Sequence, residues 1–132
     1  MSSSDVLVFI VEDEEILREV LKEGLVEGGF DVAESSNGDD ALSKLETDGA
    51  NCRALVTDIK IASKITGWDI ARRVREIVPE IPVVYVTTAG TDEWSVNGVP
   101  SSILIQKPYA VAQVVTAISQ ILNTGGPTPT AG

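Results

Sequence analysis

Residues 6–29, VLVFIVEDEEILREVLKEGLVEGG, decide the fold class of this protein. The stretch opens with six apolar residues, VLVFIV, a run that is typical of a buried β-strand. An acidic cluster follows, and apolar residues then recur at the helical spacing of three and four: Ile16, Leu17, Val20, Leu21 and Leu25. We therefore expect a buried strand that leads directly into an amphipathic helix, which ends at Gly28 and Gly29.

The same order of strand and helix recurs along the rest of the chain. Apolar, β-rich runs predict further strands at residues 30–35, 54–57, 82–87 and 103–106. Helical periodicity predicts helices at residues 39–46, 68–78 and 110–122, and Asn37-Gly38 indicates a turn. Segment 88–102 contains two glycines and a proline and has little periodicity, so we expect its helix to be short, distorted or replaced by a loop.

Strands that alternate with helices, and that are apolar throughout, predict an α/β fold with a parallel sheet covered on both faces. In such a sheet every strand points the same way. The residues that follow each strand therefore gather along one edge, where ligands bind in open α/β sheets. The functional residues are expected at that edge.

Length and composition limit the organisation of the protein. With 132 residues, of which 43% are hydrophobic, the chain fits one domain, which we place at residues 1–124. Residues 125–132, GGPTPTAG, have the composition of a disordered tail. Cys52 is the single cysteine and there is no histidine, which excludes an internal disulfide and the usual zinc sites.

The charge of the protein indicates which partners it can have. A net charge of −10 disfavours binding to DNA, RNA or an anionic membrane, because the field of the protein repels phosphate groups. The N-terminus carries only six apolar residues in a row and no basic region, so it predicts neither a signal peptide nor a membrane span. We expect a soluble cytoplasmic protein whose partners are proteins or cations.

Polar residues follow four of the predicted strands at the functional edge. They are Glu12, Asp13, Asp58, Thr87, Thr88 and Lys107. Carboxylates from neighbouring strands repel each other unless a hard cation such as Mg²⁺ or the lysine neutralises them. A carboxylate can also attack phosphorus, and a threonine hydroxyl can donate to a phosphoryl oxygen. Each residue alone has an ordinary explanation as a helix cap, a surface residue or a strand former, but their joint position indicates a site.

Four motifs in this order, VFIVEDE, LVTDIK, VVYVTT and IQKPY, resemble the receiver domains of two-component response regulators, which have the CheY-like fold. The resemblance covers nearly the whole chain. It implies a doubly wound (βα)5 sheet with strand order 2-1-3-4-5. It also implies that Asp58 accepts a phosphoryl group from a histidine kinase or a phosphotransfer protein.

The resemblance assigns roles to the other edge residues as well. Asp13, Asp58 and the backbone carbonyl of Lys60 would bind Mg²⁺, and Glu12 would assist directly or through water. Lys107 would pair with the phosphate, and Thr87 would move toward it. The surface around the fourth helix and fifth strand would then be rearranged, as a shift in the populations of two states.

The chain departs from the family pattern at three places. The family usually has an aromatic switch residue three positions before the lysine, where this chain has Leu104. The loop IKIASKITG after Asp58 lacks the usual proline and reaches Gly67 one residue later than the common pattern. Thr88 stands where the family often has a smaller residue. The readout of the switch and the rate of dephosphorylation are therefore not predicted.

We compare three functions for this chain. The first is a phosphorylatable switch that acts by binding another protein or by passing phosphate onward, because the tail is too short for a DNA-binding or enzymatic output domain. The second is a receiver-like binding module that works without phosphorylation, which Leu104 favours. The third, an aspartate-based phosphohydrolase or a nucleotide binder, fits poorly because no second acid soon follows Asp58 and the first turn is VEDEE rather than glycine-rich.

The last predicted helix suggests an interaction surface. Its residues outside the apolar stripe carry no charge: Ala112, Gln113, Thr116, Ser119 and Gln120. A solvated helix face normally carries charges, so this face is either a surface of small residues or a partner surface. In the second case, the region around residues 103–122 would bind another protein or form a homodimer.

Overall fold

The computed structural model describes residues 6–61, 64–88 and 91–123, and it confirms the predicted fold class. Five parallel strands form one sheet in the order β2-β1-β3-β4-β5. The strands are β1 (Leu7–Val11), β2 (Asp31–Ser35), β3 (Cys52–Asp58), β4 (Val83–Thr87) and β5 (Ser102–Gln106). The predicted tail, residues 125–132, lies outside the described residues.

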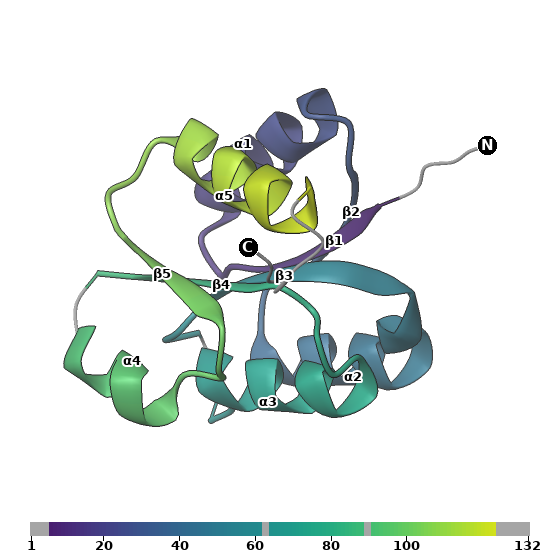
Figure 1. Ribbon diagram of the computed structural model, residues 1–132, viewed down its shortest axis with the longest axis vertical. Coiled ribbons are helices and arrows are strands. Elements are labelled where there is room, and N and C mark those ends of the chain that lie inside the picture. The colour runs from purple at the N-terminus through teal and green to yellow at the C-terminus, as the bar shows by residue number, and fades with distance from the viewer. Residues whose placement is uncertain (1–5, 62–63, 89–90, 124–132) are drawn as a thin grey trace.

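Helices cover both faces of the sheet (Figure 1). They are α1 (Glu15–Glu27), α2 (Gly38–Asp48), α3 (Gly67–Ile77), α4 (Thr91–Asn97) and α5 (Val111–Asn123), with a short 3-10 turn at Gly49–Asn51. Helices α1 and α5 lie on one face, and α2, α3 and α4 lie on the other. Within the described residues, no helix is both long and apolar enough to cross a membrane.

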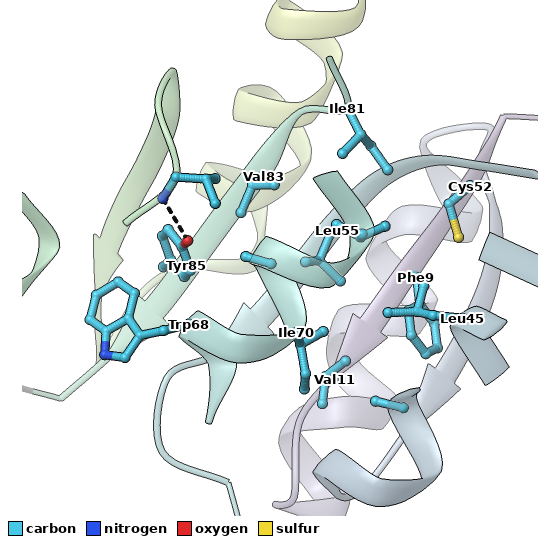
Figure 2. Close-up of a cluster of buried hydrophobic side chains, with 14 of the residues drawn as sticks. Phe9, Val11, Leu45, Cys52, Leu55, Trp68, Ile70, Ile81, Val83 and Tyr85 are labelled. Atoms are coloured by element: carbon cyan, nitrogen blue, oxygen red, sulfur yellow. Dashed lines mark hydrogen bonds between the residues drawn. The ribbon is translucent and has the colours of Figure 1, made fainter. Parts of the chain in front are cut away.

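Alternate side chains of each strand enter two separate cores. On β1, Val8 and Ile10 pack toward α1 and α5, whereas Phe9 and Val11 pack toward α2 and α3. Figure 2 shows the second core, in which Leu55 of β3 lies at the centre of the apolar side chains. Strands buried on both faces explain why the sequence shows continuous apolar runs instead of an alternating pattern.

The prediction that the apolar residues of α1 form one buried stripe is wrong for the first turns of the helix. Leu21 and Leu25 are buried, but Ile16 is 80% exposed and Val20 is 43% exposed. The contact face instead includes Gly24, where a methyl group would collide with Val111 of α5. Glycine allows the two helices to approach closely, and a pattern of hydrophobic residues does not register it.

Two local predictions are settled by the helix termini. The helix expected to be short within residues 88–102 is α4, which has seven residues. Asn37, expected in a turn, instead caps α2, since its side-chain oxygen accepts a hydrogen bond from the Asp40 backbone N–H at 2.8 Å. Part of the loop after Asp58, residues 62–63, lies outside the described residues.

Candidate functional site

Three charged side chains at the ends of β1, β3 and β5 meet at the carboxyl edge of the sheet. Lys107 Nζ lies 2.9 Å from Asp58 Oδ2 and 3.2 Å from Glu12 Oε1. The side chains are 10%, 9% and 1% exposed for Lys107, Asp58 and Glu12, respectively. The structure therefore brings together one cation and two buried acids from distant parts of the sequence.

The charges of this cluster are not balanced. Burial raises the pKa of Glu12 and of Asp58 above their ordinary values, even though Lys107 lowers both. Burial also opposes the charged form of Lys107, but the hydrogen bond and charge of Asp58, together with Glu12, raise the pKa of the lysine. One lysine thus neutralises two carboxylates only partly, and the site favours a further cation.

A third acid completes a candidate metal centre. Glu12, Asp13 and Asp58 each offer one carboxylate oxygen, and these oxygens lie within 4.8 Å of one another. Asp13 is exposed, so the group opens toward solvent. Glu12 Oε1 is buried without a hydrogen bond of good geometry, although Lys107 lies nearby. Hard oxygen ligands of this kind suit a hard metal cation.

The backbone around Asp58 holds the acid at the end of β3. The Ile59 N–H donates to Val86 O at 3.1 Å, and the Gly67 N–H donates to Ile59 O at 2.8 Å. A methyl group on Gly67 would collide with the carbonyl oxygen of Asp58, so α3 begins against this strand end only because the residue is glycine. Lys60 lies on the same loop with an exposed side chain, and its role as a metal ligand stays a prediction.

Thr87 ends β4, the strand between Asp58 and Lys107. It is 6% exposed, and its carbonyl oxygen accepts a hydrogen bond from the Lys107 backbone N–H at 2.6 Å. The peptide bond between Lys107 and Pro108 is cis. Thr87 and the lysine are thus joined through the backbone, while Thr88 next to it is exposed. The role of the Thr87 hydroxyl in phosphoryl binding stays a prediction.

Sequence reasoning did not single out Tyr85, a fully buried aromatic residue of β4. Tyr85 of β4 is paired in register with Leu104 of β5, the position where an aromatic was expected. The Tyr85 ring packs against Trp68 with 4.8 Å between centroids, and its hydroxyl accepts a hydrogen bond from the Val99 N–H at 3.0 Å (Figure 2). The Tyr85 ring is therefore a buried part of the core beside Leu104. The signal that could have pointed to Tyr85 was its position in the sequence, two residues before Thr87.

The comparisons with known proteins agree with this geometry. Residues 8–119 match the family model described as the response regulator receiver domain. The transcriptional regulatory protein CusR of Escherichia coli K12 is 31% identical over 120 residues, which cover 89% of this chain and 52% of CusR. The probable transcriptional regulatory protein SilR of Salmonella typhimurium is 32% identical over 120 residues, which cover 89% of this chain and 51% of SilR.

The chain spans about half the length of these curated relatives. A solved structure matches over nearly its full length. The crystal structure of a response regulator receiver protein from Sinorhizobium medicae WSM419 is 40% identical, with a TM-score of 0.87, and the alignment covers 92% of this chain and 98% of that chain.

Proposed function

Because the chain belongs to the family of response regulator receiver domains, we propose that it is a signalling switch in which Asp58 accepts a phosphoryl group. The observation that carries this proposal is the contact between Lys107 and Asp58 inside a group of three acids. The receiver domain is assigned to residues 1–124, which the match to residues 8–119 supports.

The proposed reaction is a nucleophilic displacement at phosphorus. A carboxylate oxygen of Asp58 attacks the phosphohistidine of a histidine kinase or phosphotransfer protein, and an O–P bond forms while the P–N bond breaks. The electron pair stays on the imidazole, and an acyl phosphate forms on Asp58. Slow autodephosphorylation by water reverses the signal. The protein does not turn over a separate substrate in this proposal.

The acidic group would hold the cofactor of this reaction. The carboxylates of Glu12, Asp13 and Asp58 and the backbone carbonyl of Lys60 would bind Mg²⁺, with Glu12 acting directly or through water. When bound, Mg²⁺ neutralises the negative charge of the transferring phosphoryl group. Glu12 Oε1, which is buried and makes no hydrogen bond beside its ion pair with Lys107, and the excess of acids over bases support this assignment.

Lys107 and Thr87 would bind the phosphoryl group after transfer. Lys107 already lies at hydrogen-bonding distance from Asp58 and would move to a phosphoryl oxygen. The Thr87 hydroxyl would donate to another oxygen. Because the Thr87 carbonyl is bonded to the Lys107 backbone, movement of either residue is passed to β5. Phosphorylation would shift the population toward the state in which α4 and β5 present a different surface.

The partners in this proposal are proteins in the cytoplasm: a histidine kinase or phosphotransfer protein, and an unidentified downstream protein. The charge of −10 argues against binding to nucleic acid or to an anionic membrane.

A homodimer through residues 103–122 is supported by a shallow groove along β5 and α5. The residues that line this groove are all uncharged. They are Ile103, Ile105, Ala112, Gln113, Thr116, Ala117, Gln120 and Ile121. Sedimentation equilibrium of wild type and of Thr116→Glu tests the dimer.

A second candidate function is a binding module that does not use phosphorylation. Leu104 in place of the aromatic switch residue favours it, and so does the Tyr85 hydroxyl, which is already engaged by Val99. In this function Lys107 and Asp58 would form a permanent ion pair. The two functions differ in whether a mimic of the phosphoryl group, such as beryllofluoride, changes the affinity for a partner.

Intact-mass measurement after incubation with acetyl phosphate tests the proposed function. Wild type should gain one phosphoryl adduct with Mg²⁺ and none in EDTA, and Asp58→Asn should gain none in either buffer. Asp48→Asn is a matched control at an exposed acid and should behave as wild type. Absence of an adduct with acetyl phosphate and also with a phosphohistidine donor would establish the binding module instead.

A further inference from the structure

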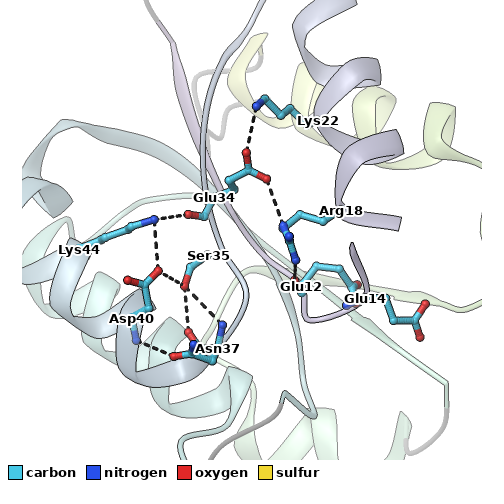
Figure 3. Close-up of polar contacts among 9 residues, drawn as sticks. All are labelled: Glu12, Glu14, Arg18, Lys22, Glu34, Ser35, Asn37, Asp40 and Lys44. Carbon is cyan, nitrogen blue, oxygen red and sulfur yellow. Dashed lines mark hydrogen bonds and ion pairs between the residues drawn. The ribbon is translucent and has the colours of Figure 1, made fainter. Parts of the chain in front are cut away.

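The guanidinium of Arg18 bridges the acidic loop after β1 and the edge strand β2 (Figure 3). Arg18 Nη1 donates to the backbone carbonyl of Glu12 at 2.9 Å, and Arg18 Nε donates to Glu34 Oε1 at 3.1 Å. The Arg18 side chain is 17% exposed, although it belongs to the first turns of α1, where Ile16 is largely exposed. The arginine is therefore directed inward, toward the loop.

Glu34 is itself a fixed anchor. Its second carboxylate oxygen accepts a hydrogen bond from Lys22 Nζ at 3.0 Å, and its backbone carbonyl accepts one from Lys44 Nζ at 2.6 Å. The hydrogen bond from Lys22, followed by the contacts with Arg18, lowers the pKa of Glu34 despite partial burial, so this carboxyl is ionised at neutral pH. Glu34 is a charged acceptor that Lys22 also holds in place, so it keeps the Arg18 guanidinium in one orientation.

The hydrogen bond from Arg18 to the Glu12 carbonyl also affects the position of Asp13. That carbonyl belongs to the peptide group between Glu12 and Asp13, and a peptide group is planar. On the other side of Glu12, its N–H donates to the Ser35 carbonyl at 3.1 Å. Residues 34 and 35 of β2 therefore fix both peptide groups that flank Glu12, one directly and one through Arg18. The contact through Arg18 fixes the Glu12–Asp13 peptide group, and this peptide group sets the direction of the Asp13 side chain.

We propose that Arg18, oriented by Glu34, is a positioning residue that holds the Glu12–Asp13 peptide so that both carboxylates of the loop face the cation bound with Asp58. This inference rests on the proposed function, because it takes the acidic group to be a Mg²⁺ site. Residues that orient the ligands of a metal typically change its affinity by roughly 10- to 100-fold when they are removed.

Electrostatics alone predicts the opposite effect. Arg18 is a permanent positive charge close to a cation site, so its removal should favour binding of Mg²⁺. A positioning role predicts weaker binding instead, because the loop loses the contact that fixes its shape. Arg18→Lys separates the two roles further, since lysine keeps the charge but lacks the planar group whose Nε and Nη1 reach Glu34 and Glu12 from two separate atoms.

Mg²⁺ binding measured by isothermal titration calorimetry, without any phosphoryl donor, tests the proposal. We expect Arg18→Gln and Arg18→Lys to weaken Mg²⁺ binding by roughly tenfold. Glu34→Gln should weaken it less, because a neutral amide oxygen still accepts from Arg18. Lys22→Ala is the matched control: it removes one positive charge from the same helix and one partner of the same Glu34, but it does not contact the loop.

Phosphorylation by acetyl phosphate gives a second measurement. The Arg18 variants should need about tenfold more Mg²⁺ for half of the maximal rate and should recover the wild-type rate at saturation. Circular dichroism and urea unfolding identify variants that do not fold, and a folded Arg18→Lys or Glu34→Gln keeps the test decisive.

The two failures can be distinguished. If wild type does not bind Mg²⁺, the proposed metal site is wrong. If wild type binds Mg²⁺ and the folded Arg18 variants bind it equally well or more tightly, the site stands and the positioning role of Arg18 is overturned.

Discussion

The ammonium group of Lys107 reaches across β4 to lie 2.9 Å from the acceptor oxygen of Asp58. The same group lies 3.2 Å from Glu12, so one cation serves two acids that are almost completely buried. The site is therefore built with less positive charge than it needs. In the proposed function, a divalent cation and a phosphoryl group, added together, would change this balance and free the lysine to move.

Lys107→Ala should destabilise the metal-free protein by about 3 kcal/mol at pH 7, because removing one partner of a buried ion pair leaves uncompensated charges. Mg²⁺ should reduce this loss, since it neutralises the same carboxylates. Urea unfolding in EDTA and in Mg²⁺ measures both values. Lys64→Ala, at an exposed lysine, is the control and should change the stability by less than about 0.5 kcal/mol. Equal effects of the two variants would contradict the shared role of Lys107.

Asp58→Asn should make the metal-free protein more stable than wild type at neutral pH. Burial raises the pKa of Asp58 in the folded state above its ordinary value of 3.8, so the folded protein holds this proton more tightly than the unfolded chain. Below pH 3.8 the carboxyl is protonated in both states and costs nothing. As the pH rises through the raised folded pKa, wild type loses this stability, whereas asparagine cannot ionise.

Urea unfolding of both proteins in EDTA, at a series of pH values, measures the effect. The difference in unfolding free energy should grow with pH above the ordinary aspartate value and then become constant. A difference that shrinks as the pH rises would show that Lys107 overcompensates for the burial of Asp58.

Gly67→Ala should destabilise the fold by about 2 kcal/mol, because the added methyl group meets backbone atoms of Asp58 and Ile59 that cannot move independently. Phosphorylation of Asp58 should slow as well. The control is Gly49→Ala, where the methyl group would lie 3.1 Å from the end of the flexible Ile77 side chain. Thermal unfolding and the rate of adduct formation compare the two. Similar losses in both variants would argue against a specific constraint at Asp58.

The sequence sufficed for the sheet and for most of the acidic edge because both follow from local patterns. Parallel strands place their carboxyl ends together, so Glu12, Asp58 and Lys107 could be grouped without knowing any distance. The strand order came only with the family resemblance. The structure adds what these residues do to one another, namely that a single lysine contacts both acids.

The contacts that were missed are made by side chains that reach between elements. In the sequence, Arg18 is an ordinary polar residue of a predicted helix. Nothing in the sequence indicates that its side chain turns toward Glu12 and Glu34. Ile16 was placed in the core of α1 because it is apolar, but the helix packs with its glycines against α5. Such contacts depend on the angle at which elements pack, which periodicity does not contain.

Tyr85→Phe should destabilise the protein by about 1–3 kcal/mol, because the Val99 N–H, which is buried, would lose its hydrogen-bond acceptor. The ring contact with Trp68 would be kept, so the loss reports the hydroxyl alone. Urea unfolding gives the stability. Hydrogen exchange of the Val99 amide, followed by NMR, should become faster by more than the change in global stability if the connection from α4 to β5 opens locally.

The control for this substitution is Tyr109→Phe. Within the described part of the chain, Tyr109 Oη is one of two buried side-chain oxygens that have no hydrogen-bond partner, so removing it should be neutral or slightly stabilising. Two chemically identical substitutions are thus expected to differ in sign or nearly so. If Tyr85→Phe is as harmless as Tyr109→Phe, the bond to Val99 does not hold the connection between α4 and β5, and Tyr85 acts through its ring alone.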